Sequence, residues 1–153
     1  MNTWMIRSSR GKLADDFESN GVVAIGYGIS ENLSRFHDLE NLREYLKSLD
    51  IAANPAGQIS RFVCEIQPGD NIITYDSAAR QYLLGIAGEY FYNEGIFENL
   101  RQFRKVQWIH RIDRDNLSKR AKGCLGSLLT VFSLAPEVKE EIHRLADGAP
   151  PSK

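Results

Sequence analysis

The stretch RQYLLGIAGEYFY, residues 80–92, constrains the fold more than any other part of the chain. Its apolar side chains stand at consecutive rather than alternate positions, which predicts a strand covered on both faces. Gly85 and Gly88 interrupt this strand, and glycine weakens a strand unless a bend, a bulge or a close backbone approach requires it. The stretch therefore predicts a strongly curved sheet.

Two further strands flank this stretch. Residues 70–76, DNIITYD, have the β-rich composition of a strand, and the connection 77–79 is short enough to predict a hairpin. Residues 105–112 predict the next strand, which ends before the turn-rich DRDNLS. The second half of the chain is therefore dominated by three strands in succession.

The chain begins with a strand, a short helix and a second strand. Residues 3–7 and 22–27 are apolar enough for strands, and the second of these is expected to be buried. Between them, 13–19 predicts a short helix that Asn20-Gly21 would terminate, because glycine accommodates the left-handed conformation of a helix end.

Three more helices follow from the apolar periodicity. Asp38 is available as the N-cap of a helix at 38–49, and Asn54-Pro55 can cap and start another. Pro136 lies in the first turn of a last helix. The first two helices are apolar on one side only, so we expect them to pack against the sheet.

These elements predict an α+β fold, with a small curved mixed β-sheet or barrel of about five to six strands and surrounding helices. A length of 153 residues fits one domain, which we assign to residues 1–147. Residues 148–153 have the composition of a linker. We expect this tail to lead to an effector domain in a longer protein.

Composition limits the setting of the protein. No run approaches the roughly 18 to 20 apolar residues of a membrane span, and the start lacks a signal-peptide apolar stretch, so we expect a cytoplasmic protein. Cys64 and Cys124 have no metal-ligand spacing and no nearby histidine. They predict reduced thiols, and neither a metal nor a cofactor is implied.

Charge is distributed unevenly along a chain whose net charge is only -1. Residues 101–122 contain eight Lys and Arg against two Asp. Such segregation can create a basic face on a nearly neutral protein, and phosphate binding depends on Lys and Arg. A solvated strand edge and helix surface would explain the same excess.

Catalytic motifs are weak. Glu137 and Lys139 have the acid-x-lysine spacing of metal-dependent nucleases, but they lie on a helix pattern and no strand-borne Asp precedes them. The histidines have no serine or cysteine nucleophile in a recognisable elbow. The glycines beside Tyr27 lack the third glycine and the lysine of a phosphate-binding loop. We therefore expect this chain not to be an enzyme.

Aromatic residues are more informative than the acids. Tyr27 and Tyr75 each end a predicted strand, and Tyr90 and Tyr92 end the long one. If the sheet curves, rings at strand ends can gather at one opening and hold a flat heterocycle between their faces. The two tryptophans, taken singly, favour core positions.

Four stretches of the chain carry a family resemblance: WMIRSSRGKLADDFESNGVVAIGYG, GDNIITYD, YLLGIAGEYFY and RKVQWIHRIDRDNLS. Together they resemble the PUA-like superfamily, in particular its EVE and YTH branches and the similar amino-terminal modules of modification-dependent restriction endonucleases. The likeness covers about residues 3–132. In YTH domains, a strand ending in Lys-Ser precedes a loop, a helix and a second strand ending in a cage tryptophan; here the matching residues are 6–8 and 25–27. Tyr27 replaces that tryptophan.

The resemblance implies a module that accepts one flipped-out, often methylated nucleobase in an aromatic pocket, with DNA favoured over RNA as the partner. It implies the specificity module of a modification-dependent restriction system, with a fused or partner nuclease. The side chains expected to hold the base are Trp4, Ser8, Ser9, Tyr27, Tyr75, Tyr90, Tyr92 and Trp108. The side chains expected to hold phosphates are Arg7, Arg10, Lys12, Arg104, Lys105, Lys119 and Arg120.

Two other functions remain open from the sequence. The same fold can bind a modified base in RNA, in which case 2′-hydroxyl contacts would contribute to affinity. A protein-binding adaptor would instead present an exposed apolar patch, which a sequence does not reveal.

Overall fold

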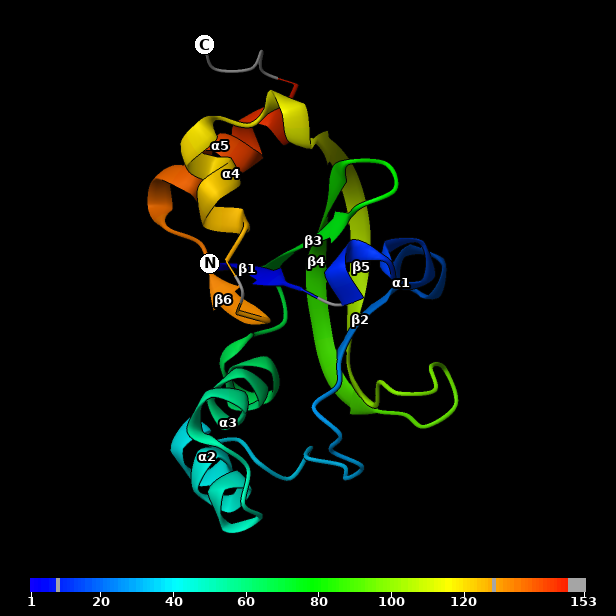
Figure 1. Ribbon diagram of the computed structural model, residues 1–153, viewed down its shortest axis with the longest axis vertical. Coiled ribbons are helices and arrows are strands. Elements are labelled where there is room, and N and C mark those ends of the chain that lie inside the picture. Colours follow the sequence, from blue (N-terminus) through cyan, green and yellow to red (C-terminus); the bar gives the residue numbers. More distant parts are fainter. Residues whose placement is uncertain (8, 128, 149–153) are drawn as a thin grey trace.

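A six-stranded mixed sheet forms the centre of the molecule, shown as a computed structural model in Figure 1, which describes residues 1–7, 9–127 and 129–148. The strands lie in the order β2-β5-β4-β3-β1-β6, and only β1 and β3 are parallel. Their bounds are β1 (Thr3–Ile6), β2 (Val22–Ile25), β3 (Asn71–Asp76), β4 (Gln81–Tyr92), β5 (Gln102–Asp113) and β6 (Val131–Ser133). The expected curved mixed sheet is confirmed, but it is not closed into a barrel, since β2 and β6 are its edges.

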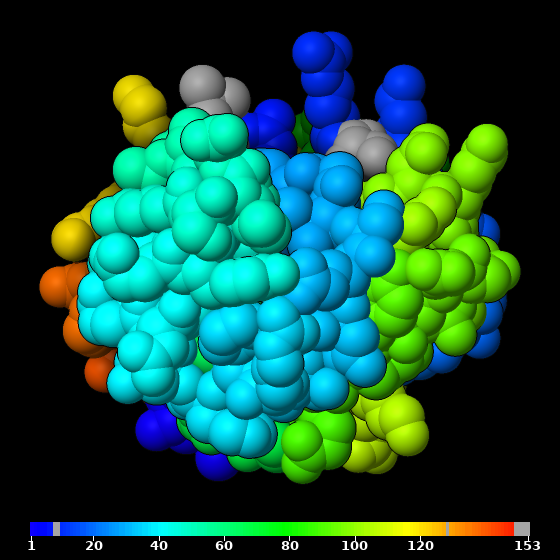
Figure 2. Space-filling model, turned by 90° about the horizontal axis from the view of Figure 1, so that it is seen from below, coloured from blue at the N-terminus to red at the C-terminus, as the bar shows by residue number. Residues whose placement is uncertain are grey.

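Helices pack around the sheet. They are α1 (Ala14–Asn20), α2 (Leu39–Ser48), α3 (Ala53–Ser60), α4 (Lys119–Leu125) and α5 (Pro136–Ala146). Shorter turns of helix are η1 (Ser9–Gly11), the π-type η2 (Arg61–Glu65) and η3 (Arg114–Asn116). In Figure 1, α4 and α5 lie to the left of the upper part of the sheet, and α2 and α3 lie at its lower left. Seen from below, α2 and α3 lie beside the segment 26–38, with the β4–β5 connection on that segment's other side (Figure 2).

Both faces of the sheet are buried, as the run of consecutive apolar residues predicts. Side chains alternate between faces along a strand. In β1, Trp4 and Ile6 therefore join one core cluster with Phe17 and the α2 and α3 side chains. Met5 joins a second cluster with α4 and α5. This explains why every residue of β1 is buried.

The bend of the long strands depends on Gly85. The register of β4 and β5 shifts between Leu84 and Gly85, and again between Ala87 and Tyr90. A Cβ atom at Gly85 would lie 2.6 Å from Cγ1 of Val106 and 2.7 Å from the carbonyl oxygen of Gln107. The expected close backbone approach at this glycine is therefore confirmed.

Three local signals at helix ends have their expected roles, whereas Asn54 does not cap α3, because that helix begins at Ala53 with Ala52 as its N-cap. The Asp38 carboxylate accepts a hydrogen bond of 2.8 Å from the backbone N–H of Glu40 and caps α2. Gly21 ends α1 with a φ of 63°. Pro136 begins α5. These residues satisfy backbone groups, or adopt dihedral angles, that helix ends require.

Two elements have no counterpart in the sequence-based expectation. Helix α4 is seven residues long and contains Gly123, and strand β6 has only three residues. Ser118 caps α4 by accepting a hydrogen bond from the backbone N–H of Ala121. Strand β6 exists through pairing with β1, in which Trp4 lies opposite Ser133. Pairing with a distant segment leaves no local sequence signal.

Two glycines give a matched test of this account. We expect Gly85→Ala to lower the free energy of unfolding by about 1 to 3 kcal/mol, because the methyl group overlaps the neighbouring strand. Gly123→Ala should raise it by about 0.5 to 1 kcal/mol, since this helix position has open space around it. Urea denaturation measures both. Equal effects of the two substitutions would contradict the close approach at Gly85.

Candidate functional site

A cavity of about 260 Å³ opens between the upper ends of β1, β3 and β4 and the segment that leads into and out of α4. We call it the tyrosine–arginine cavity. Its lining residues are Met5, Arg7, Arg10, Gly11, Tyr75, Tyr82, Arg114, Lys122, Leu125 and Gly126. The lining thus contains four cationic side chains and, among the described residues, no carboxylate.

Two tyrosines form its aromatic wall. Tyr75 and Tyr82 lie directly opposite each other on β3 and β4, with ring centroids 4.8 Å apart and planes inclined by 43°. Tyr82 is buried, and burial raises the pKa of its hydroxyl. Tyr75 is half-buried. The pair therefore forms a rigid aromatic surface, in which the ring of Tyr75 is more accessible than the buried ring of Tyr82.

The β1–α1 connection holds this wall from the other side. Gly11 has a φ of 80°, and a Cβ atom there would lie 2.9 Å from Cδ2 of Tyr75. The Gly11 carbonyl accepts hydrogen bonds from the backbone N–H and the hydroxyl of Ser77, at 3.0 and 3.1 Å. Arg7 donates to the carbonyl of Ser127 at 3.0 Å. These contacts bring three distant segments together at the cavity.

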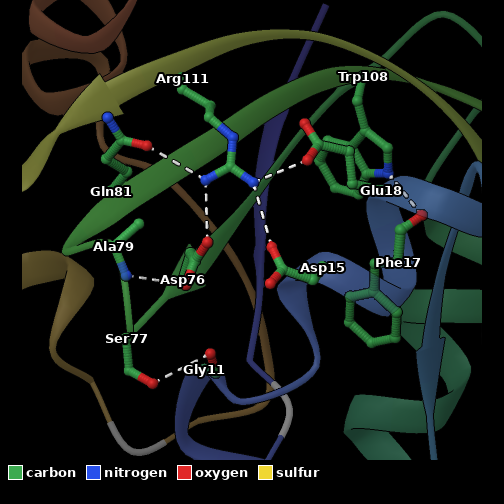
Figure 3. A network of polar contacts seen from close by, with 10 residues as sticks. All are labelled: Gly11, Asp15, Phe17, Glu18, Asp76, Ser77, Ala79, Gln81, Trp108 and Arg111. Carbon is green, nitrogen blue, oxygen red and sulfur yellow. Dashed lines mark hydrogen bonds and ion pairs between the residues drawn. The ribbon is translucent and has the colours of Figure 1, made fainter.

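Three acidic residues near the hairpin are paired with Arg111, as Figure 3 shows. Its guanidinium binds Asp76 at 2.9 Å, Glu18 at 2.7 Å and Asp15 at 3.5 Å. It also donates to the side chain of Gln81 at 3.1 Å. Arg111 thereby ties α1 to the β3–β4 hairpin and leaves the cations of the tyrosine–arginine cavity without these acids as partners.

The network shifts the titration of its buried carboxyl group. Burial raises the pKa of Asp76, but hydrogen bonds from Arg111 and from the backbone of Ala79 outweigh burial, so this pKa lies below its ordinary value. The pKa of Arg111 is raised by its hydrogen bonds to Glu18 and Asp76. The charged pair is therefore the stable form near neutral pH.

The predicted base-binding residues lie in several separate parts of the structure. Trp4 is 2% exposed and donates its indole N–H to Asp70 at 3.1 Å, so it is a core residue. Trp108 is half-buried and donates to the Phe17 carbonyl at 3.1 Å (Figure 3). Ser8 and the side chain of Ser9 lie outside the part of the chain that the structure describes.

The other predicted rings lie at both ends of the sheet. Tyr75 lines the tyrosine–arginine cavity, whereas Tyr27, Tyr90 and Tyr92 lie at the opposite, lower end. Tyr27 is 39% exposed and has a φ of 64°. The hydroxyl of Tyr90 bonds with Gln102 and with the backbone N–H of Leu33. These rings therefore do not all line the same opening.

The predicted phosphate-binding residues are also dispersed. Arg7 and Arg10 line the tyrosine–arginine cavity. Lys12, which follows them closely in the sequence, is exposed. Lys119 and Arg120 begin α4, where Arg120 pairs with Glu137 at 3.6 Å. Lys105 is exposed on the lower half of β5. In contrast, Arg104 is buried.

Three polar side chains of the lining are not among the site residues that the sequence predicts: Tyr82, Arg114 and Lys122. Counting outward from the expected 77–79 connection places Gln81 opposite Tyr75, but the connection in the structure is one residue longer, 77–80, and therefore places Tyr82 there. Arg114 and Lys122 belong to the basic excess of 101–122. Only the packing of α4 on the sheet brings them to the same cavity.

Other classes of site find no support in the described ranges. The residues that the structure describes contain no group of three His, Cys, Asp or Glu side chains placed to hold a metal ion. None of the helices in these ranges combines the length and the apolar character needed to cross a bilayer.

Solved structures with a similar fold include three YTH domains. The YTH domain of the Zygosaccharomyces rouxii MRB1 protein, solved with N6-methyladenosine RNA, is 14% identical with a TM-score of 0.52, covering 98% of this chain and 89% of that one. The Pho92 YTH domain, solved with m6A, is 12% identical at 0.52, covering 94% and 84%. The Toxoplasma CPSF4-YTH domain in apo form is 10% identical at 0.50, covering 99% and 89%. The predicted EVE/YTH-like fold is confirmed.

The chain belongs to the family described as "Domain of unknown function (DUF8426)", whose model matches residues 4–135. This range includes nearly the whole sheet and helices α1 to α4. No match was found among curated proteins.

The Arg111 network predicts an acid-sensitive contribution to stability. A carboxyl group whose folded pKa is depressed stabilises the fold above its unfolded pKa of about 3.9, and this contribution is lost as the pH falls through the lower folded value. Asp76→Asn should therefore cost about 2 to 4 kcal/mol at pH 7, because it leaves Arg111 without its buried partner. The cost should shrink below about pH 4.

The control for this prediction is Asp115→Asn. Asp115 pairs with Arg80 at 2.6 Å in an exposed position, where ion pairs contribute little. Thermal unfolding from pH 3 to 7 measures both variants. A loss for Asp76→Asn that does not depend on pH would show that packing, and not charge, is what the substitution removes.

Proposed function

We propose that this chain is a nucleic-acid-binding module that reads modified bases and carries out no catalysis itself. The observation that supports this function is the tyrosine–arginine cavity, in which an aromatic pair adjoins four cations. A flat ring and a negatively charged backbone are the two features of a nucleotide that such a cavity complements. Two of the structurally similar YTH domains were solved with N6-methyladenosine RNA or m6A.

In this proposal, one base leaves its stack and packs against the outer face of Tyr75. Extruding a base costs a few kcal/mol, and stacking on one aromatic side chain returns about 1 to 3 kcal/mol. The volume of about 260 Å³ lies just below the range of pockets for drug-sized molecules, so the cavity suits a single base rather than a whole nucleotide. Arg114 and Lys122 then face the edge of the base or the adjoining phosphate.

Phosphates on either side of the extruded base are bound by cations at the cavity mouth. Arg10 and Lys12 are exposed, and Arg7 is fixed by its hydrogen bond to Ser127. Contacts of this kind supply affinity that does not depend on base sequence and decreases with salt. Selection of the modification therefore depends on the tyrosine pair and the polar groups beside it.

We further propose DNA as the substrate and a modification-dependent restriction system as the setting, with an effector nuclease elsewhere. Support comes from the resemblance of the four sequence stretches to the amino-terminal modules of such endonucleases. A modified base in RNA is the alternative, which the RNA complex of the MRB1 domain favours. Competition between DNA and RNA oligonucleotides of the same sequence distinguishes them, since RNA recognition uses the 2′-hydroxyl groups.

The base-stacking role of Tyr75 has a direct test. Tyr75→Ala should weaken binding to an oligonucleotide with one modified base by about 5- to 100-fold, because one stack is lost. It should change binding to the unmodified oligonucleotide much less. Fluorescence anisotropy with a panel of single base modifications measures both affinities.

Tyrosines at the lower end of the sheet are the controls. Tyr92→Ala removes a half-buried ring whose hydroxyl bonds with Glu94, and Tyr27→Ala removes the exposed ring that replaces the cage tryptophan. Both should retain the preference for the modified base. A preference that disappears in Tyr27→Ala and survives in Tyr75→Ala would place the base at the lower end and contradict the proposed site.

The phosphate-binding role predicts a change in salt dependence. The double variant Arg10→Gln and Lys12→Gln should reduce the slope of log affinity against log salt by about 2, which is roughly 0.9 for each lost contact with duplex DNA. Affinity should fall equally for modified and unmodified strands. The matched control is Arg43→Gln with Lys47→Gln on α2, where both side chains pair with neighbouring glutamates. An unchanged slope in the first variant would rule out these phosphate contacts.

A further inference from the structure

A second cavity, of about 330 Å³, lies at the lower end of the molecule and shares no residue with the tyrosine–arginine cavity. We call it the Arg104 cavity. It is enclosed by the segment 34–37, the turn that follows η2 and the lower parts of β4 and β5 (Figure 2 shows this end). Its lining includes Ser34, Phe36, Gln67, Glu89, Tyr90 and Arg104.

Arg104 carries a buried charge without an acidic partner. It is 3% exposed, and its guanidinium donates to the backbone carbonyls of Phe62 at 3.2 Å and Ile66 at 2.6 Å. Its Nε–H group has no hydrogen-bond partner. Among the described residues, Arg104 takes part in none of the ion pairs.

The nearest carboxylates do not neutralise this charge. Asp70 interacts with Arg104 only at longer range, and its oxygens accept from the indole of Trp4 at 3.1 Å and the backbone of Gln67 at 3.0 Å. Glu89 lines the cavity, and its charge raises the pKa of Arg104 more than that of Asp70 does, but Glu89 is exposed to water. Burial lowers the pKa of Arg104, which shows that its surroundings disfavour the cation. A buried cation that lacks a partner is costly.

The two carbonyl bonds explain part of the position of Arg104. Both carbonyls belong to η2 and the residue that ends it, so Arg104 fastens that turn to β5. A neutral donor would serve the same purpose at a lower cost. The permanent charge, the unpartnered Nε–H and the adjoining cavity are left unexplained by this structural role.

We propose that the Arg104 cavity is a binding site for a small ligand with an oxyanion, either a carboxylate or a phosphate. The anion lies next to Arg104 and supplies the missing negative charge. Polar groups of Ser34 and Gln67 lie around the same space, and the Tyr90 ring forms one wall, held in place by the bonds of its hydroxyl to Gln102 and Leu33. Glu89 disfavours ligands with more negative charge than Arg104 can neutralise.

Nuclear magnetic resonance of the full chain tests this site. The Nε–H signal of Arg104, assigned with the Arg104→Lys variant, is followed as acetate or inorganic phosphate is added at constant ionic strength, with chloride as the reference. We expect a saturable shift of this signal and of the backbone signals of Gln67 and Tyr90. Saturation with acetate alone identifies a carboxylate ligand, and saturation with phosphate alone identifies a phosphate. Shifts that never saturate, or that chloride reproduces, would overturn the proposal.

Two exposed positions give variants that preserve the fold. Ser34→Phe fills the mouth and should abolish the saturable shift, whereas Ser19→Phe, on the exposed face of α1, adds the same ring elsewhere and should leave it unchanged. Glu89→Gln should tighten anion binding by about two- to five-fold, since it removes one nearby, solvent-screened negative charge. A saturable shift that persists in Ser34→Phe would place the anion outside this cavity.

The outcome is independent of the proposed nucleic-acid site. Ser34 lies at the other end of the molecule from Tyr75, so Ser34→Phe should bind modified oligonucleotides as the unchanged protein does. Failure of anion binding would leave the base-reading proposal intact, and failure of base reading would leave the Arg104 cavity intact.

Discussion

The close approach of β4 to β5 at Gly85 is the constraint on which the rest of the structure depends. These are the two longest strands, and their contact at this residue leaves no room for a Cβ atom. The two register shifts bend β4 and β5, so the two ends of the sheet are well separated. Helices α4 and α5 lie beside the upper end, and α2 and α3 lie beside the lower end (Figure 1). The two core clusters lie on opposite faces of the sheet, and each end of the sheet has a cavity of its own.

The two ends of the sheet differ in charge because the acidic residues near one of them are held in ion pairs. Arg111 takes up Asp15, Glu18 and Asp76, so the carboxylates nearest the β3–β4 hairpin are already paired. The tyrosine–arginine cavity is left with four cationic side chains, of which Arg10 is exposed, and this suits a solvated phosphate backbone. Arg104 is instead a single buried cation in a fixed position. This arrangement suits one small anion that leaves water.

Much of the fold could be predicted from the sequence because its signals are local. The spacing of apolar residues located α2, Asp38 located its start, and the glycines of β4 indicated the bend. Elements defined by distant contacts could not be found in this way: β6 depends on pairing with β1, and α4 is too short to show a periodicity. The candidate site was predictable in residue type but not in grouping. Tyr75 and Tyr90 both stand near strand ends, yet antiparallel neighbours end at opposite edges, so the two rings lie far apart.

Contact between a modified base and the tyrosine pair is the central claim. Its most direct measurement is the set of nuclear Overhauser effects between the methyl protons of a modified base in a bound oligonucleotide and the aromatic protons of the protein. The account predicts effects to the ring of Tyr75. Effects to the rings of Tyr27, Tyr90 or Tyr92 instead would contradict it.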